Sequence, residues 1–148
     1  MIVKEPNKDY EKKYREHIQS NEKSRIYHTL KWEQITEDIK HKPYYLLAID
    51  ENEEIAGVLL LFFVDNFSGK KIISVPLRDR CGPIYNNLEA LQLLLKKGKE
   101  LCREKKCFFI EIKMTEQLPE EVIKKLGFVK SEFLIRTRTN LEKPIEEL

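Results

Sequence analysis

The stretch that decides the fold runs from Lys70 to Phe128 and reads KKIISVPLRDRCGPIYNNLEALQLLLKKGKELCREKKCFFIEIKMTEQLPEEVIKKLGF. Its hydrophobic periodicity and its Gly and Pro residues predict five elements. These are a strand at 72–76, a loop at 75–87, an amphipathic helix at 88–105, a second strand at 108–114 and a short helix at 119–127. A strand that runs through a glycine-containing loop into a helix brings backbone N–H groups and a positive helix end to the carboxyl edge of a sheet. Ligands of open α/β folds bind at that edge, so the loop is the predicted ligand site.

The two helices of this stretch carry clear local signals. The longer helix has an apolar stripe that includes Gly98, where glycine costs about 1 kcal/mol against alanine, so we expect a close approach to the sheet there. The shorter helix has Pro119 in its first turn and Gly127 at its C-cap.

The N-terminal half predicts two helices before a hairpin. Asn7 is placed to cap a helix whose Tyr10, Tyr14 and Ile18 recur every fourth residue, and Ile26-Tyr27 reads as extended. Thr29 is placed to cap a second helix, with Trp32, Ile35 and Ile39 on one face.

Apolar runs at 44–49 and 55–64, separated by the acidic turn 50–53, predict an antiparallel hairpin whose second strand is central. A last strand is expected at 133–138 after the short helix. The predicted fold is α/β, with a mixed, mostly antiparallel central sheet flanked by helices on both faces, in one domain over residues 1–148.

Composition excludes several classes of protein. The 148 residues, 41% of them hydrophobic, fit one globular domain, and the formal net charge of +2 gives no general field for capturing nucleic acid or a membrane surface, although a local patch can still bind phosphate. We expect the protein in the cytoplasm. Its three cysteines form no CxxC pair, and the sequence has no signal-peptide core and no apolar run long enough to span a membrane. No metal-ligand spacing, catalytic carboxylate pair, Walker motif or dinucleotide fingerprint is present, so no metal is expected.

The loop supplies the candidate binding residues. Arg78 and Arg80 are placed to clamp a phosphate or carboxylate, or to pair with Asp79 at the surface. Gly82 and Pro83 either let a substrate approach the backbone or form an ordinary tight turn.

Three further side chains have a binding and a structural interpretation. Tyr85 either contacts a ligand or is a half-buried aromatic, and Trp32 is either a stacking platform or a core anchor. Asn86 is a binding candidate, although its Asn-x-x-Glu spacing with Glu89 favours helix capping. Cys81 as a nucleophile requires a base such as His28 nearby in space.

The order of elements, ending in Leu126-Gly127-Phe128 and a last strand, resembles the GNAT acyltransferase superfamily. More narrowly, the segment 28–32 (HTLKW) before the hairpin and Ser74-Val75-Pro76 followed by 81–84 (CGPI) resemble the first domain of Fem-type aminoacyltransferases and their FemAB-like relatives. Those proteins contain two GNAT-like domains and transfer an acyl group onto the amine of a cell-wall (peptidoglycan) precursor. The resemblance therefore implies acetyl-CoA or aminoacyl-tRNA as acyl donor, with tRNA bound through a partner domain, and a second GNAT-like domain or a homodimer as partner.

The chain departs from both family patterns at identifiable positions. Thr36 stands where the Fem enzymes have a phosphate-binding lysine, and Asn86 where they have an aspartate, so neither the ammonium nor the base is available. Ordinary GNAT enzymes bind the CoA pyrophosphate with a Gln/Arg-x-x-Gly-x-Gly loop, of which 78–83 (RDRCGP) is a poor copy because Pro83 lacks an N–H. A tyrosine that often serves GNAT enzymes as general acid has no counterpart in 115–128.

Three functions remain open from the sequence. The first is a FemAB-like acyl or aminoacyl transferase domain that contributes the acceptor-substrate site through Arg78, Arg80, Gly82, Tyr85 and Asn86. The second is a non-catalytic binding or dimerisation module with the same fold. The third is a small stand-alone CoA-dependent N-acetyltransferase.

Overall fold

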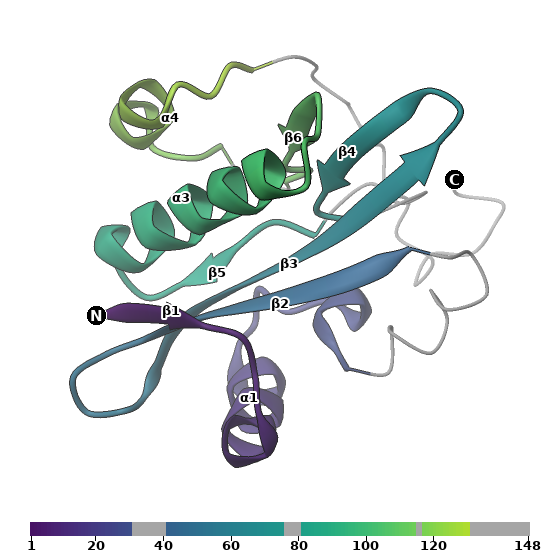
Figure 1. Ribbon diagram of the computed structural model, residues 1–148. Coiled ribbons are helices and arrows are strands. Elements are labelled where there is room, and N and C mark those ends of the chain that lie inside the picture. Colours follow the sequence, from purple (N-terminus) through teal and green to yellow (C-terminus); the bar gives the residue numbers. More distant parts are fainter. Residues whose placement is uncertain (31–40, 76–80, 115–116, 131–148) are drawn as a thin grey trace, which may run out of the picture.

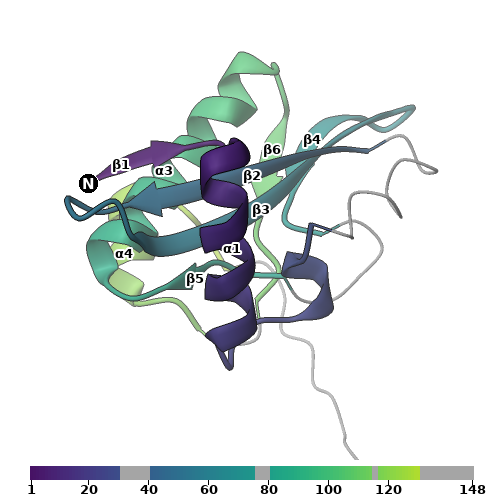
Figure 2. The same cartoon turned by 90° about the horizontal axis from the view of Figure 1, so that it is seen from below.

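A computed structural model of the chain describes residues 1–30, 41–75, 81–114 and 117–130. Within this part of the chain the strand order is β1-β2-β3-β4-β6, and β5 pairs with β3 off that path. The strand pairs are antiparallel except for β4 and β6, which run parallel. Helix α1 covers one face of the sheet, and α3 and α4 lie on the other (Figures 1 and 2). The predicted mixed α/β fold with helices on both faces is confirmed.

The elements in chain order are β1 (Ile2–Lys4), α1 (Lys8–Ser20), the 3₁₀ helix η1 (Ile26–His28), β2 (Lys42–Ile49), β3 (Ile55–Asn66), β4 (Gly69–Ile73), β5 (Ile84–Tyr85), α3 (Leu88–Glu104), β6 (Phe109–Glu111) and α4 (Glu120–Leu126).

Strand β3 divides the core in two. Successive side chains of a strand point to opposite faces, so alternate residues of β3 join different clusters. Val58, Leu60 and Phe62 pack with α1, whereas Leu59 and Leu61 pack with α3 and α4. This strand is apolar on both faces because it is central, as the sequence predicted.

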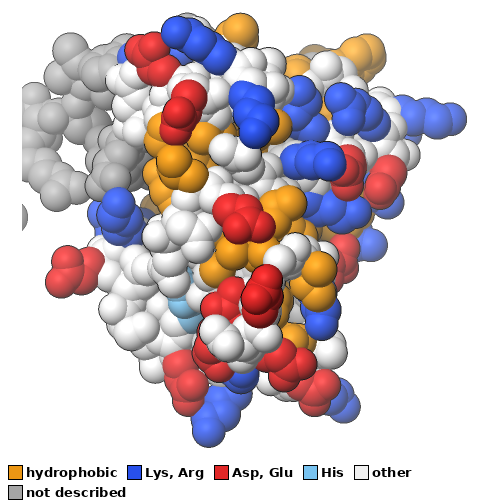
Figure 3. Space-filling model, turned by 90° about the vertical axis from the view of Figure 1, so that its left-hand side faces the viewer, with side chains coloured by type: hydrophobic (Ala, Val, Ile, Leu, Met, Phe, Trp, Pro, Cys, Tyr) orange, Lys and Arg blue, Asp and Glu red, His pale blue; other side chains and the backbone are white. Residues whose placement is uncertain are grey.

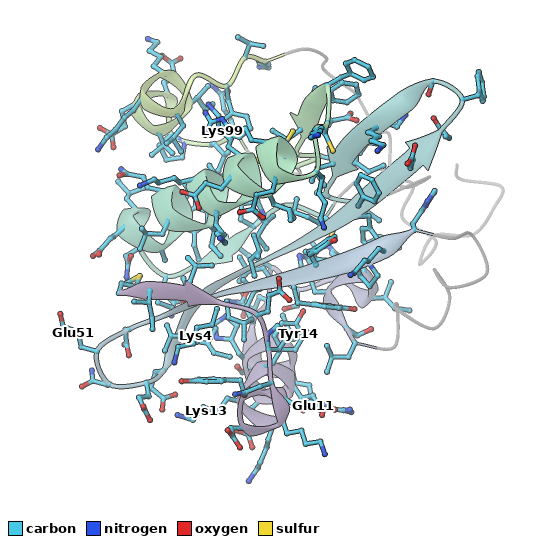
Figure 4. The ribbon with its side chains drawn as sticks, viewed as in Figure 1. Lys4, Glu11, Lys13, Tyr14, Glu51 and Lys99 are labelled. Atoms are coloured by element: carbon cyan, nitrogen blue, oxygen red, sulfur yellow. The ribbon has the colours of Figure 1, made fainter. Side chains whose placement is uncertain are left out.

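Helix α1 begins and packs as its sequence predicts. The Asn7 side-chain oxygen accepts hydrogen bonds from the backbone N–H groups of Asp9 and Tyr10, at 3.1 and 3.2 Å. Tyr14 points from α1 toward the sheet (Figure 4) and its ring meets that of Tyr45 edge-on, with centroids 5.8 Å apart. The helix is thereby fixed against β2.

Gly98 brings α3 close to the sheet. A Cβ at this position would lie 3.0 Å from Cδ1 of Ile110 and 3.1 Å from Cδ1 of Leu61. These distances are shorter than ordinary van der Waals contact, so the expected close approach is confirmed.

Helix α4 ends at Gly127, which has a φ of 66° in the left-handed region. The N–H of Phe128 donates to the carbonyl of Ile123 at 2.9 Å, and the Lys99 ammonium reaches across from α3 to the Leu126 carbonyl (Figure 4). The predicted glycine cap is confirmed, and α3 supplies a cation at the negative end of α4.

Several local predictions differ from the structure. Ile26-Tyr27 is not extended but forms η1, since the N–H groups of His28 and Thr29 donate to the carbonyls of Arg25 and Ile26. The strand predicted at 108–114 is regular only at Phe109–Glu111. The predicted helix after Thr29 and the strand at 133–138 lie outside the described residues.

Candidate functional site

Strand β3 changes its partner midway along its length. Its end, from Phe62 to Asn66, pairs with β4, and Gly57-Val58 pairs with β5. Residues 74–83 therefore connect two short strands that lie along the same neighbour. The break falls inside the loop that the sequence predicts as the ligand site.

Hydrogen bonds from the β6 segment hold both sides of this break. The N–H of Ser74 donates to the Glu111 carbonyl at 3.0 Å, and the Ser74 hydroxyl accepts from the N–H of Lys113 at 2.9 Å. The N–H of Cys81 then donates to the Lys113 carbonyl at 3.0 Å. The described residues on the two sides of the loop, Ser74 and Cys81, are therefore both bound to the β6 segment.

The two chain segments meet at Gly82 and Met114. A Cβ on Gly82 would lie 3.1 Å from Cγ of Met114, so glycine allows the two segments to touch. After Gly82 the chain enters β5, which pairs with β3, and in Figure 1 β5 and α4 lie on opposite sides of α3.

A hollow of about 60 Å³ lies beside this contact, and its described lining is Lys23, Arg25, His28, Cys81, Gly82, Pro83, Ile84, Tyr85, Met114 and Gln117. The described lining contains two cationic side chains and no carboxylate. The electrostatic environment of this hollow therefore favours an anionic or neutral group and disfavours a further cation.

His28 links η1 to Gly82 at the hollow through hydrogen bonds. It is only 2% exposed, and its Nδ1 accepts the backbone N–H of Arg25 at 3.0 Å. The proton is therefore on Nε2, which donates to the Gly82 carbonyl at 3.0 Å. Burial lowers the pKa of His28, so the ring is neutral near pH 7.

Tyr14 extends this connection to α1. Its hydroxyl donates to the backbone carbonyl of His28, and burial raises the pKa of the phenol, so the group remains a donor. A chain of contacts thus runs from α1 through η1 to Gly82. Sequence reasoning considered His28 only as a base for Cys81 and missed this role, because a lone histidine outside a periodic element carries no signal of its partners.

Cys81 is not arranged as a nucleophile. Its side chain is 1% exposed, and burial raises the pKa of the thiol to about 12, so it stays protonated near neutral pH. Both ring nitrogens of His28 are already engaged, which leaves that ring no lone pair to activate the thiol. The Cys81–His28 hypothesis has no support in this geometry.

The structure brings three of the predicted site residues together and separates one from them. Gly82, Pro83 and Tyr85 line the hollow. Asn86 is exposed and outside this lining, and its N–H donates to the Ala56 carbonyl at 2.8 Å. Arg78, Arg80, Trp32 and Thr36 lie outside the described residues.

Capping of α3 by Asn86 was a wrong prediction. The N-cap is Asn87, whose side-chain oxygen accepts the N–H of Ala90 at 2.9 Å. The bond between Asn86 and Ala56 keeps Asn86 on the β5 side and leaves the next residue at the start of the helix.

The start of α3 is a poor anion site. The Asn87 side chain already occupies the N–H of Ala90, and Glu89 adds an exposed carboxylate in the first turn. A negative side chain at this helix end competes with any bound phosphate for the positive dipole. Around the hollow, the described cations come instead from Lys23 and Arg25, at the entry to η1.

The described residues contain neither a cluster of metal ligands nor a membrane-spanning helix. In the four described segments, no three or more His, Cys, Asp or Glu side chains are grouped as metal ligands. Among the helices of those segments, none has the length and apolar character needed to cross a membrane.

No family model matches the chain, and no curated protein matches its sequence. Solved structures match it closely in fold. Aminoglycoside 6'-N-acetyltransferase AAC(6')-Ig from Acinetobacter haemolyticus is 14% identical with a TM-score of 0.61, over 95% of this chain and 99% of that one. Aminoglycoside N-acetyltransferase AAC(6')-Iy in complex with CoA is 14% identical with a TM-score of 0.58, over 93% and 98%.

A transcriptional regulator from Bacillus halodurans C-125 is 16% identical with a TM-score of 0.60, over 93% of this chain and 98% of that one. At such identities the comparisons establish the fold alone. The chain has the GNAT fold and spans nearly the whole length of these neighbours. None of the three is described as a Fem-type protein, so the narrower resemblance stays a proposal.

Proposed function

We propose that this chain is an acyltransferase that acylates an amine, and that the acyl group enters the hollow beside Gly82. The observation that carries the proposal is the hollow beside Gly82, where the residue before β5 contacts Met114 of the β6 segment. Because the hollow measures about 60 Å³, it admits a group of a few atoms rather than a whole substrate. The fold is that of structures described as N-acetyltransferases, which supports the same class of reaction.

Acetyl-CoA is the first donor to test, since one neighbour of the same fold is described in complex with CoA. The residues at the start of α3 do not fit the donor's phosphates, because Asn87 and Glu89 occupy and oppose that helix end. We therefore place no phosphate contact at α3. The side chains of Lys23 and Arg25 are the described cations at the hollow.

The described lining residues act by position rather than by proton transfer. His28 is a positioning residue: it holds the Gly82 carbonyl through Nε2–H and has no free nitrogen to serve as base. None of the described lining residues is a carboxylate, so none of them can take a proton from the acceptor amine in that way. Orientation of donor and amine at the hollow then supplies the rate enhancement.

Calorimetric titration with acetyl-CoA tests the proposal. We expect saturable binding to the wild type and a loss of roughly tenfold or more for Gly82→Leu, because the new side chain meets Met114, which also lines the hollow, and changes the shape of the hollow. Glu51→Ala, at the tip of the turn between β2 and β3 (Figure 4), is the control and should bind like the wild type. Absence of binding to the wild type, or equal binding to Gly82→Leu, contradicts the proposal.

The narrower FemAB-like role is part of the same proposal. In that role the chain corresponds to the first of two GNAT-like domains, and Arg78, Arg80, Gly82, Tyr85 and Asn86 serve the acceptor. It predicts binding of a UDP-linked muropeptide that weakens in the double variant Arg78→Ala with Arg80→Ala. Charged tRNA should bind only when a partner domain is present. Unchanged muropeptide binding in the double variant removes this role and leaves the acetyltransferase reading intact.

A non-catalytic module is the second candidate, favoured by one observation. The described lining offers neither a general base nor an ionised thiol, since His28 is fully engaged and Cys81 is protonated. A module of this kind should show no heat of binding with acetyl-CoA, muropeptide or charged tRNA.

A further inference from the structure

Three phenylalanines on this protein are exposed to an unusual degree. Phe67 is 105% exposed, Phe108 80% and Phe109 49%. Scattered apolar residues are common on protein surfaces, but exposed aromatic side chains that gather in one region mark an interaction site.

All three lie at one end of the sheet. Phe67 belongs to the turn that joins β3 to β4, two residues before Gly69. The N–H of Phe108 donates to the Lys70 carbonyl at 2.9 Å, and its ring lies so close to Gly69 that no Cβ would fit there. Phe109 pairs with Lys71 at the start of the parallel strands β4 and β6.

Cations surround these rings. We call the three phenylalanines and the neighbouring charged residues the aromatic end; its charged members are Lys42, Lys70, Lys71, Arg103, Lys105 and Lys106, with Asp65 and Glu104. Among the described residues, these six cations stand against three carboxylates, Asp65, Glu104 and, two residues after Phe109 on β6, Glu111, in a chain whose formal net charge is +2. The side of the molecule shown in Figure 3, at the left of Figure 1, carries basic side chains mainly in its upper part and acidic ones mainly in its middle and lower part.

Two of the lysines are held in place. The ammonium groups of Lys42 and Lys105 lie 5.3 and 5.7 Å from the centre of the Tyr44 ring. Nζ of Lys70 lies 3.8 Å from Oδ2 of Asp65, and both side chains are exposed. Such an ion pair is weak, so it cancels little of the positive charge in this region.

We propose that the aromatic end docks on an anionic phospholipid surface, with Phe67 and Phe108 inserted at the headgroup boundary and the lysines over the acidic headgroups. Phe67 is on a turn and Phe108 on a short connection, and the hollow beside Gly82 is lined by neither ring. Rings carried by connections at the end of a sheet suit insertion into a soft surface, whereas bases stack on aromatic side chains of a sheet face. Lysines near an acidic membrane surface each add to the attraction.

Vesicle co-sedimentation tests the proposal with the full chain. The probes are phosphatidylcholine vesicles with and without 30% phosphatidylserine, in low and physiological salt. We expect binding to the anionic vesicles, weaker binding as salt rises, and little binding to the neutral ones. Phe67→Ser with Phe108→Ser should weaken binding about a hundredfold, roughly tenfold for each ring.

Matched variants separate docking from general effects. Ile26→Ser removes another exposed apolar side chain, 65% exposed on η1, and should bind like the wild type. Lys70→Glu with Lys106→Glu should abolish the preference for anionic vesicles, whereas Lys8→Glu with Lys12→Glu on α1, the same change in net charge, should retain most of it. Circular dichroism checks that each variant is folded.

Other outcomes overturn the proposal. Equal binding of wild type and the double phenylalanine variant, or no binding to anionic vesicles, excludes a lipid surface. Tighter binding of a single-stranded oligonucleotide than of vesicles assigns the aromatic end to nucleic acid. Self-association in the ultracentrifuge that disappears in Phe67→Ser with Phe108→Ser assigns it to a second copy of this chain.

Discussion

Acidification should destabilise this protein between neutral pH and pH 5.5, and His28 should account for most of the effect. Burial lowers the pKa of His28 in the folded chain below its ordinary value of 6.5. The unfolded chain therefore takes up a proton before the folded one does as pH falls. The stability that depends on neutral His28 is present above about pH 6.5 and is lost as pH falls from there toward the folded pKa.

The structure sets the size of this effect. When one histidine stays neutral in the folded chain and is charged in the unfolded chain, the free energy of unfolding falls by up to about 1.4 kcal/mol for each unit by which the pH is lowered. His17, on α1, also has a pKa lowered by burial, but it is only partly buried, so solvent reduces its share. We expect a loss of about 1 to 2 kcal/mol in the free energy of unfolding between pH 7.5 and 5.5.

Urea denaturation at several pH values between 7.5 and 5.5 measures this loss. His28→Gln should lower the free energy of unfolding at pH 7.5 by about 1 to 3 kcal/mol, because at least one partner of the ring is left unpaired. The same variant should lose most of the pH dependence, while His17→Gln keeps most of it. A slope for His28→Gln equal to that of the wild type would refute the neutral, doubly bonded ring.

Three further predictions can be checked by urea denaturation or thiol labelling. Tyr14→Phe should cost about 1 to 3 kcal/mol, since the His28 carbonyl loses its donor; a change below 0.5 kcal/mol would contradict that hydrogen bond. Asn87→Ala should lower the free energy of unfolding by about 1 kcal/mol, and Asn86→Ala by about half of that or less. A larger loss for Asn86→Ala would instead support Asn86 as the cap, as the sequence predicted. Cys81 should resist a thiol reagent at pH 8 in the folded protein and react after unfolding, because it is buried and its pKa is raised to about 12; rapid labelling of the folded protein at Cys81, identified by mass spectrometry, would disprove this.

Elements set by local signals were predictable from the sequence. Asn7 caps α1, Gly127 ends α4, and Gly98 permits the approach of α3, because each depends on a short stretch of chain or on one helical stripe. The central position of β3 followed from its apolar character on both faces. These signals sufficed for the fold class.

The site depended on contacts between distant residues, and there the sequence was less informative. Asn86 and Asn87 are chemically identical neighbours, and what separates them is a bond from Asn86 to Ala56 on β3. His28 meets Gly82 across 54 positions of sequence, a pairing that no local pattern encodes. The contact between Gly82 and Met114 likewise joins two segments that are far apart in the sequence.

Backbone amide NMR during titration with acetyl-CoA tests the central claim most directly, because it reports where a ligand binds as well as whether it binds. Saturable shifts should centre on the amides of Gly82, Tyr85 and Met114, with little change at the aromatic end. Shifts confined to other regions, or none at millimolar acetyl-CoA, would contradict a donor site at the hollow.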